Sequence, residues 1–167
     1  MLAIEDRPVA HPSGLSAPCI VVETDGEDAA WTNSEPVVDY AGLNPAALRA
    51  RVRDAGIVGL GGAAFPTAVK LNVSGQLQAL ILNGAECEPF LTSDHRLMLE
   101  KTENILEGIE IVRRILSPQK ILIGVEENKP DAIQAIKRKL SDHQFKGQIK
   151  IARLQAKYPQ GGEKQLI

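Results

Sequence analysis

The pattern of apolar and polar positions predicts alternating helices and strands over most of the chain. Asn44 and Pro45 are residue types that begin helices, as N-cap and first helical residue. Strands that alternate with helices favour βαβ units and a parallel sheet, so the expected fold class is α/β, with a Rossmann-like parallel sheet and flanking helices. The pattern places helices over 45–54, 66–70, 93–116 and 130–140, and strands over 78–82, 120–125 and 148–154.

The first forty residues follow a different pattern. The run 19–23 reads as a strand, with turn residues on both sides, and residues 24–44 are polar and turn-rich. We therefore expect residues 1–40 to be the end of a β-rich domain plus a linker, and residues 41–167 to form the α/β domain. Two glycines followed by helix-forming residues near the C-terminus resemble a helix cut short, so the chain is expected to be an excised fragment of a longer protein.

Composition narrows the class of protein. The chain has 167 residues, 44% hydrophobic and 24% charged, with a net charge of −2. This is typical of a globular domain and provides no broad basic surface for nucleic acid. No apolar run approaches the roughly 20 residues of a membrane-spanning helix, so no transmembrane segment is expected. Cys19 and Cys87 are far apart and are expected as free thiols, because no Cys-x-x-Cys is present to hold zinc or an iron–sulfur cluster.

A glycine-rich loop follows the first helix. Residues 59–64 carry the letters G-x-G-x-x-A of a dinucleotide fingerprint, but a helix rather than a strand precedes them. Two interpretations stay open. Glycines at 59, 61 and 62 can let backbone N–H groups approach an anion, with Lys70 reaching back to a phosphate. Alternatively, the segment is a tight turn between helices with an exposed lysine.

An acidic loop follows the strand at 78–82. Asn83 ends the strand, and Glu86 and Glu88 come two residues apart at the edge where ligands bind in parallel sheets. These carboxylates can accept hydrogen bonds from ribose, an amide or a flavin, or take part in acid–base chemistry. The alternative is that they cap the following helix and carry ordinary surface charge.

Five motifs taken together resemble one family. Residues 59–70, 83–89, 94–98, 124–130 and 157–166 occur in the order found in the RnfC component of the bacterial Rnf ion-translocating electron-transport complex. The RnfC family is in turn similar to the FMN- and NADH-binding subunit of respiratory complex I. The segment 8–18 also resembles the end of the family's N-terminal biotinyl/lipoyl-like domain, so the resemblance covers the whole chain.

The resemblance implies a role for each matching position, and it implies positioning of cofactors rather than acid–base catalysis. Ala64 and Ala85 depart from the pattern: the family loop has glycine at the first position, and complex I relatives have aspartate at the second. The implied roles are as follows: Gly59, Gly61 and Gly62 line FMN, Lys70 pairs with it, Phe65 stacks on the NADH adenine, Asn83 and Glu86 contact the flavin, Tyr158 lies near it, and Glu88 and Glu163 contact the nicotinamide nucleotide.

The resemblance also implies a reaction and a location. Hydride exchange between NAD(H) and FMN would precede transfer of single electrons to two 4Fe–4S clusters outside this chain, as part of an NADH/ferredoxin-type oxidoreductase complex. The other subunits of the complex would be its partners, at the cytoplasmic face of the bacterial inner membrane, and the isolated fragment is expected to be inactive. A non-catalytic docking module of the same complex is the main alternative, and a sugar-binding or one-carbon domain is a third.

Overall fold

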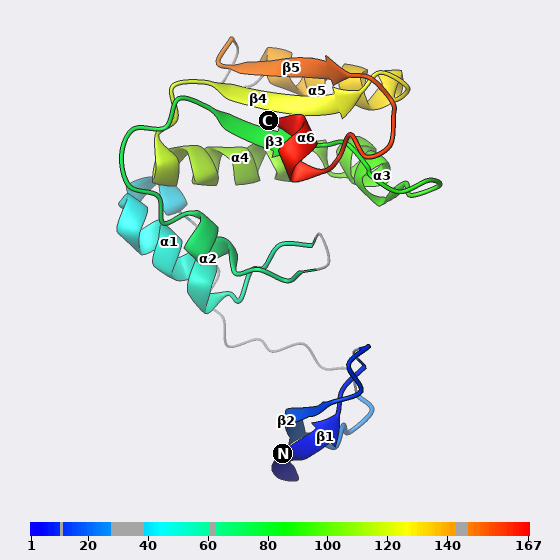
Figure 1. Cartoon of the computed structure of the whole chain (residues 1–167). Coiled ribbons are helices and arrows are strands. Elements are labelled where there is room, and N and C mark those ends of the chain that lie inside the picture. Colours follow the sequence, from blue (N-terminus) through cyan, green and yellow to red (C-terminus); the bar gives the residue numbers. More distant parts are fainter. Residues whose placement is uncertain (11, 28–38, 61–62, 143–146) are drawn as a thin grey trace. The chain divides into compact units, whose positions relative to one another are not determined.

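The computed structural model describes residues 1–10, 12–27, 39–60, 63–142 and 147–167. The chain divides into two compact units, Met1–Val38 and Asp39–Ile167. In the first unit, β1 (Ala3–Pro8) and β2 (Ser16–Val21) form an antiparallel hairpin in which Ile4 lies opposite Ile20 (Figure 1). A strand near residues 19–23 is therefore confirmed, although it begins and ends earlier. That this hairpin is the end of a biotinyl/lipoyl-like domain stays a prediction.

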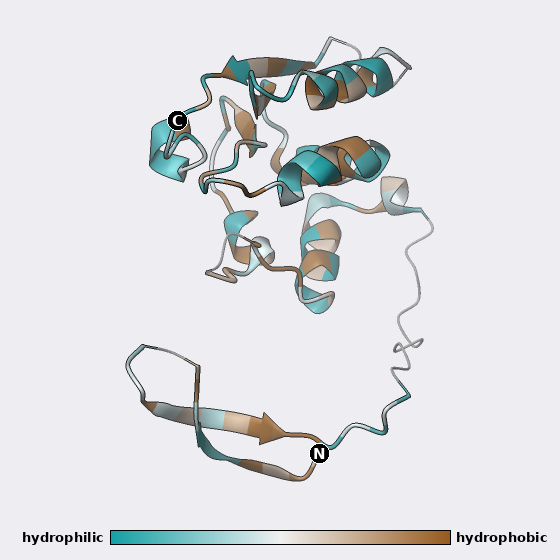
Figure 2. Cartoon of the chain, turned by 90° about the vertical axis from the view of Figure 1, so that its right-hand side faces the viewer, coloured by the Kyte–Doolittle hydropathy of each residue, from teal (hydrophilic) through white to brown (hydrophobic). Residues whose placement is uncertain are grey.

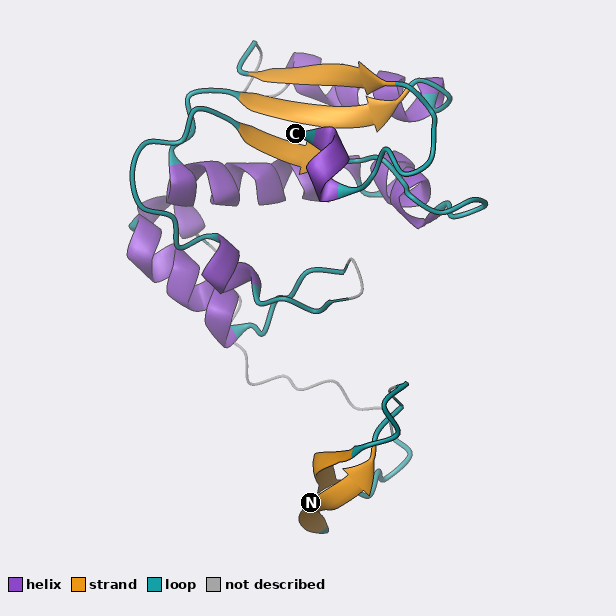
Figure 3. Ribbon diagram, viewed as in Figure 1, coloured by secondary structure: helices purple, strands orange, loops and turns teal. Residues whose placement is uncertain are grey.

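The second unit contains a parallel sheet with strand order β3-β4-β5. Leu82, Ile123 and Ile151 lie side by side across its three strands. Together with the helices around it (Figure 3), this sheet confirms the expected α/β fold class. The elements are η1 (Tyr40–Gly42), α1 (Pro45–Asp54), α2 (Thr67–Lys70), β3 (Leu80–Asn83), α3 (Ser93–Glu100), α4 (Thr102–Leu116), β4 (Ile121–Glu126), α5 (Pro130–Asp142), β5 (Ile149–Leu154) and α6 (Glu163–Leu166).

The hydrophobic core lies around the central strand β4. Val125 is fully buried, and Leu106 of α4 and Ile136 of α5 are almost so. A parallel strand covered on both faces reads as a nearly continuous apolar run, as the sequence of β4 does. The surrounding helices carry both hydrophobic and hydrophilic residues, as amphipathic helices on a core do (Figure 2).

The expectation of one helix over 93–116 is wrong, because two helices occupy this stretch. The backbone leaves the helical region at Lys101, with φ −126° and ψ 31°, between α3 and α4. The Thr102 hydroxyl donates a hydrogen bond to the Met98 carbonyl. A hydroxyl that takes a carbonyl in this way competes with the helical backbone pattern. By contrast, the predicted cap of α1 is confirmed, since Asn44 Oδ1 accepts from the Ala47 N–H at 2.9 Å.

The sheet brings three loops to one edge. Its strands are parallel, so the loops after Asn83, Glu126 and Leu154 all leave from the carboxyl ends, where the arrowheads point in Figure 1. In open α/β sheets this edge is the usual ligand-binding edge. No helix within the described residues is long and apolar enough to span a bilayer.

Candidate functional site

The glycine-rich loop is closed at its base by backbone contacts. Val58 and Pro66 form an antiparallel bridge, and the Gly59 N–H donates to the Phe65 carbonyl at 2.9 Å. Gly61 and Gly62 lie outside the described residues. Ala64 has a φ of 48°, in the left-handed region that favours glycine. The backbone therefore keeps the conformation of a glycine at the position where this chain has a methyl group.

Lys70 points back at the base of this loop. Its ammonium lies 5.9 Å from the centre of the Phe65 ring. A Cβ built on Gly59 would be 2.7 Å from Lys70 Nζ, so only glycine leaves room for the lysine there. The lysine is exposed, as is Phe65. The structure thus brings Gly59, Phe65 and Lys70 together, with a cation held over a glycine backbone, which suits a phosphate.

A second group of predicted residues lies at the carboxyl edge of the sheet. Asn83 Nδ2 donates to the Gly161 carbonyl at 2.7 Å, and Asn83 Oδ1 accepts from the Ala85 N–H at 3.1 Å. A Cβ on Gly161 would lie 2.5 Å from the Ala85 carbonyl oxygen and 2.9 Å from Cys87 Sγ. The loops after β3 and β5 are therefore packed in direct contact.

Glu86 is buried and fully engaged by protein groups. Its Oε1 accepts from the Asp94 N–H at 2.8 Å and the His95 N–H at 3.4 Å, at the start of α3. Its Oε2 accepts from Lys129 Nζ at 2.5 Å. Helix capping, one of the two interpretations of the acidic loop, thus describes these contacts. The flavin contact of Glu86 stays a prediction.

Lys129 joins Glu86 to a third buried charge. Its Nζ also lies 2.5 Å from Glu126 Oε2, which in addition accepts the Glu86 N–H at 3.3 Å. We call Glu86, Glu126 and Lys129 the buried charge cluster. Each member exposes less than a tenth of its surface. Sequence reasoning misses this cluster, because Glu126 and Lys129 flank a turn and resemble ordinary surface charge.

The cluster holds its members in their charged forms. Burial by itself raises the pKa of Glu86, but the hydrogen bonds from Lys129 and from the N–H groups of Asp94 and His95 bring that pKa below its ordinary value. Burial likewise lowers the pKa of Lys129, and the two glutamates raise it above its ordinary value. Burial, and then the Glu86 carboxylate, raise the pKa of Asp94. The balance favours ionised Glu86 and Lys129 at neutral pH.

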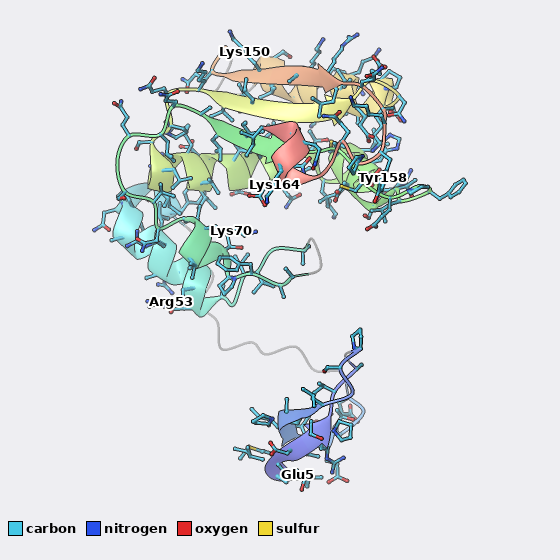
Figure 4. All side chains as sticks on the ribbon, viewed as in Figure 1. Glu5, Arg53, Lys70, Lys150, Tyr158 and Lys164 are labelled. Atoms are coloured by element: carbon cyan, nitrogen blue, oxygen red, sulfur yellow. The ribbon has the colours of Figure 1, made fainter. Side chains whose placement is uncertain are left out.

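An open pocket of about 280 Å³ lies beside the cluster. Glu88 and Tyr158, two of the predicted residues, line it and are exposed to solvent. Figure 4 shows Tyr158 on the loop beyond β5, well away from Lys70 on α2. Glu163, at the first position of α6, is exposed and does not line the pocket. The lining consists of residues 86–91, Glu126, Asn128, Lys129 and residues 156–158.

The predicted residues thus form two groups. One is Gly59, Phe65 and Lys70; the other is Asn83, Glu86, Glu88, Tyr158 and Glu163. Within the described ranges, no hydrogen bond or ion pair joins the two groups. Both loops extend toward the side of the sheet where its strands end (Figure 1). That a single ligand touches both groups stays a prediction.

Comparison with known proteins assigns the family. The model of the Nuo51 FMN-binding domain matches residues 52–167. The chain belongs to this family. Family membership covers the three-stranded sheet, both groups of predicted residues and the buried charge cluster, and excludes the N-terminal hairpin.

Two relatives of this family member have the same name. In Pseudomonas aeruginosa, the component designated C of the ion-translocating oxidoreductase complex is 44% identical over 169 residues, covering 100% of this chain and 21% of the relative. Its counterpart in Serratia proteamaculans is 48% identical, covering 98% of this chain and 23% of the relative. The resemblance to the RnfC family is therefore confirmed, and the chain spans less than a quarter of the length of these relatives.

Solved structures agree with this family assignment. The NAD+-reducing [NiFe]-hydrogenase in its H2-reduced state matches with a TM-score of 0.62 and 28% sequence identity, over 74% of this chain and 23% of that chain. The air-oxidized state of the hydrogenase matches with a TM-score of 0.61. The expected fold is thus found in a solved enzyme whose name includes reduction of NAD+.

Proposed function

We propose that this chain is the FMN- and NAD(H)-binding part of the RnfC component of an ion-translocating oxidoreductase complex. The observation that carries the proposal is the position of Lys70 Nζ, held against Gly59 in the loop that the Nuo51 FMN-binding domain model includes. A lysine ammonium over a glycine backbone is a suitable partner for a phosphate group. The site residues fit a flavin nucleotide in this respect.

The proposed roles follow the two groups. Gly59, Gly61, Gly62 and Lys70 hold the phosphate end of FMN, and Phe65 offers an exposed ring for stacking on adenine. Bound FMN supplies the exchange of a hydride with NAD(H) and the release of single electrons.

At the carboxyl edge of the sheet, Asn83 and Glu86 fix the loop against which the flavin lies. Glu88 and Glu163 accept hydrogen bonds from the nicotinamide nucleotide, and Tyr158 lies beside the flavin. This chain's own residues therefore bind and orient the nucleotides, and no proton transfer is assigned to them.

The proposal includes partners and a location. The other subunits of the complex would receive the electrons, through 4Fe–4S clusters outside this chain, at the cytoplasmic face of the bacterial inner membrane. We also propose that the chain alone does not sustain this electron transfer, because its two cysteines are both free and cannot hold a cluster.

Titration of FMN and then NADH into the purified full-length protein tests the proposal. We expect flavin fluorescence to be quenched on binding, and NADH to bleach the bound flavin under anaerobic conditions. A protein that binds partner subunits but neither nucleotide would show the docking module instead. A protein that binds neither nucleotides nor partners would reject both.

A further inference from the structure

Three charged side chains are buried together at the edge of the pocket, and they come from three segments. Glu86 lies in the loop after β3, Glu126 is the last residue of β4, and Lys129 directly precedes α5. The side chains of Glu86, Lys129 and Glu126 are 3%, 8% and 8% exposed. The buried charge cluster therefore contains two carboxylates and one ammonium, with one negative charge in excess.

The geometry points to a role for Lys129 in the nucleotide site. We propose that Lys129 is a positioning residue: it ties the loop after β3 to strand β4, and it limits the floor of the pocket to a single negative charge. This inference rests on the proposed function, because the ligand concerned is the nicotinamide nucleotide.

The position of the cluster makes its charge matter to a ligand. All three members line the pocket, together with Glu88 and Tyr158. NADH carries a dianionic pyrophosphate, so a further negative charge in the floor repels it. At about 10 Å and an effective dielectric constant near 20, one added charge weakens binding by about tenfold.

No other cation within the described residues substitutes for Lys129. It is the sole positively charged group within ion-pair distance of Glu86 or Glu126 there. Removal of Lys129 therefore leaves two adjacent carboxylates, one of which retains a proton to a much higher pH. The titratable and charged groups around the cluster are Asp94 and His95 on α3, Asp131 on α5, which is 2.9 Å from His95, and Glu88, Lys157 and Tyr158 around the pocket.

Variants that alter the charge and the contacts of the cluster separately test the proposal. Lys129→Met gives a cluster with two negative charges, the double variant Lys129→Met/Glu126→Gln restores one, and Glu126→Gln alone gives none. Glu103→Gln is the matched control, because it removes the same charge from an exposed position on α4. NADH affinity is measured for each full-length protein by fluorescence titration at about pH 8 and about pH 6.

At the higher pH we expect Lys129→Met to bind NADH about tenfold more weakly than wild type, and Glu126→Gln about tenfold more tightly. At the lower pH the loss in Lys129→Met should shrink to about threefold or less, since one carboxylate then holds a proton. The double variant and Glu103→Gln should stay near wild type at both pH values.

Two results would overturn the proposal. One is equal weakening of Lys129→Met and the double variant at both pH values, which would give Lys129 a purely structural role. The other is unchanged affinity in Glu126→Gln, a variant that tests the charge even where Lys129→Met does not fold. Wild-type protein that binds no NADH would instead reject the proposed function, and this inference with it.

Discussion

The side-chain amide of Asn83 donates to the backbone carbonyl of Gly161 at 2.7 Å, and so connects two strands that do not pair. Asn83 ends β3 and Gly161 follows β5, while β4 separates the two strands in the sheet. Asn83 therefore joins the outer loops across the end of the central strand. The walls of the pocket depend on this contact, because Glu88 and Tyr158 lie on the two loops that it joins.

Gly161→Ala should separate these two loops. The added Cβ would lie 2.5 Å from the Ala85 carbonyl oxygen, a contact that backbone must move to relieve. We expect a loss of about 1–3 kcal/mol in the free energy of unfolding, measured by urea denaturation. Gly108→Ala is the control: nothing lies within 4 Å of its Cβ on helix α4, so it should stabilise the protein by up to about 1 kcal/mol. Equal effects of the two variants would contradict the close packing.

Lys70→Ala should weaken FMN binding by about tenfold to a hundredfold. The change removes one charge-assisted hydrogen bond to phosphate, worth roughly 1.5–3 kcal/mol. Quenching of flavin fluorescence provides the measurement. Lys150→Ala, at an exposed position on β5, removes a lysine elsewhere and should leave the affinity unchanged. If Lys70→Ala retains wild-type affinity, the exposed-lysine interpretation of the loop is correct.

Glu88→Gln should raise the dissociation constant for NADH and leave flavin content nearly intact. Glu88 is exposed in the pocket, so its loss removes a ligand contact without disturbing the fold. Glu86→Gln should instead lower the free energy of unfolding by about 1.5–3 kcal/mol, because Glu86 accepts hydrogen bonds from Lys129, Asp94 and His95. Nucleotide titration and urea denaturation of both variants separate the two effects. The same pattern of losses in both variants would show that the assignment of roles is wrong.

Acid should weaken the wild-type protein partly through Glu86. The pKa of this carboxyl is lower in the folded protein than its ordinary value, the net result of burial, which raises it, and the hydrogen bonds from Lys129, Asp94 and His95, which lower it further. Its stabilising contribution is therefore complete above the unfolded pKa of about 4.3 and is lost as the pH falls through the lower folded value. Urea denaturation at a series of pH values should give a shallower decline in stability below about pH 4.3 for Glu86→Gln than for wild type. Parallel declines would contradict this role.

Periodicity in the sequence predicts most of the fold, for identifiable reasons. The apolar run of β4 and the Asn44–Pro45 helix start depend on local residue types, so the pattern predicts both elements. The break at Lys101 escapes prediction, because apolar spacing continues across it and the side-chain bond of Thr102 decides the geometry. The left-handed backbone at Ala64 becomes predictable only by comparison with a family that has glycine there.

The site is predictable where its residues fall within motifs and not where they meet through the fold. Lys70 and Gly59 lie within one motif, and the structure brings them together. Lys129 lies forty-three residues from Glu86, and nothing in a lysine near two glutamates indicates a buried cluster. The motif assigns Glu86 to a ligand, whereas its contacts with Asp94 and Lys129 show a role that only tertiary structure can reveal.

The N-terminal hairpin has a consequence for how the chain exchanges its amide hydrogens. An isolated two-stranded ribbon is marginally stable in water, and β1 and β2 pair only with each other within the described residues. Strand β4 lies between two strands and contains the fully buried Val125. Amides of the hairpin therefore open by local fraying and exchange early, while those of β4 wait for global unfolding of the α/β unit. A single melting temperature would describe the second behaviour and miss the first.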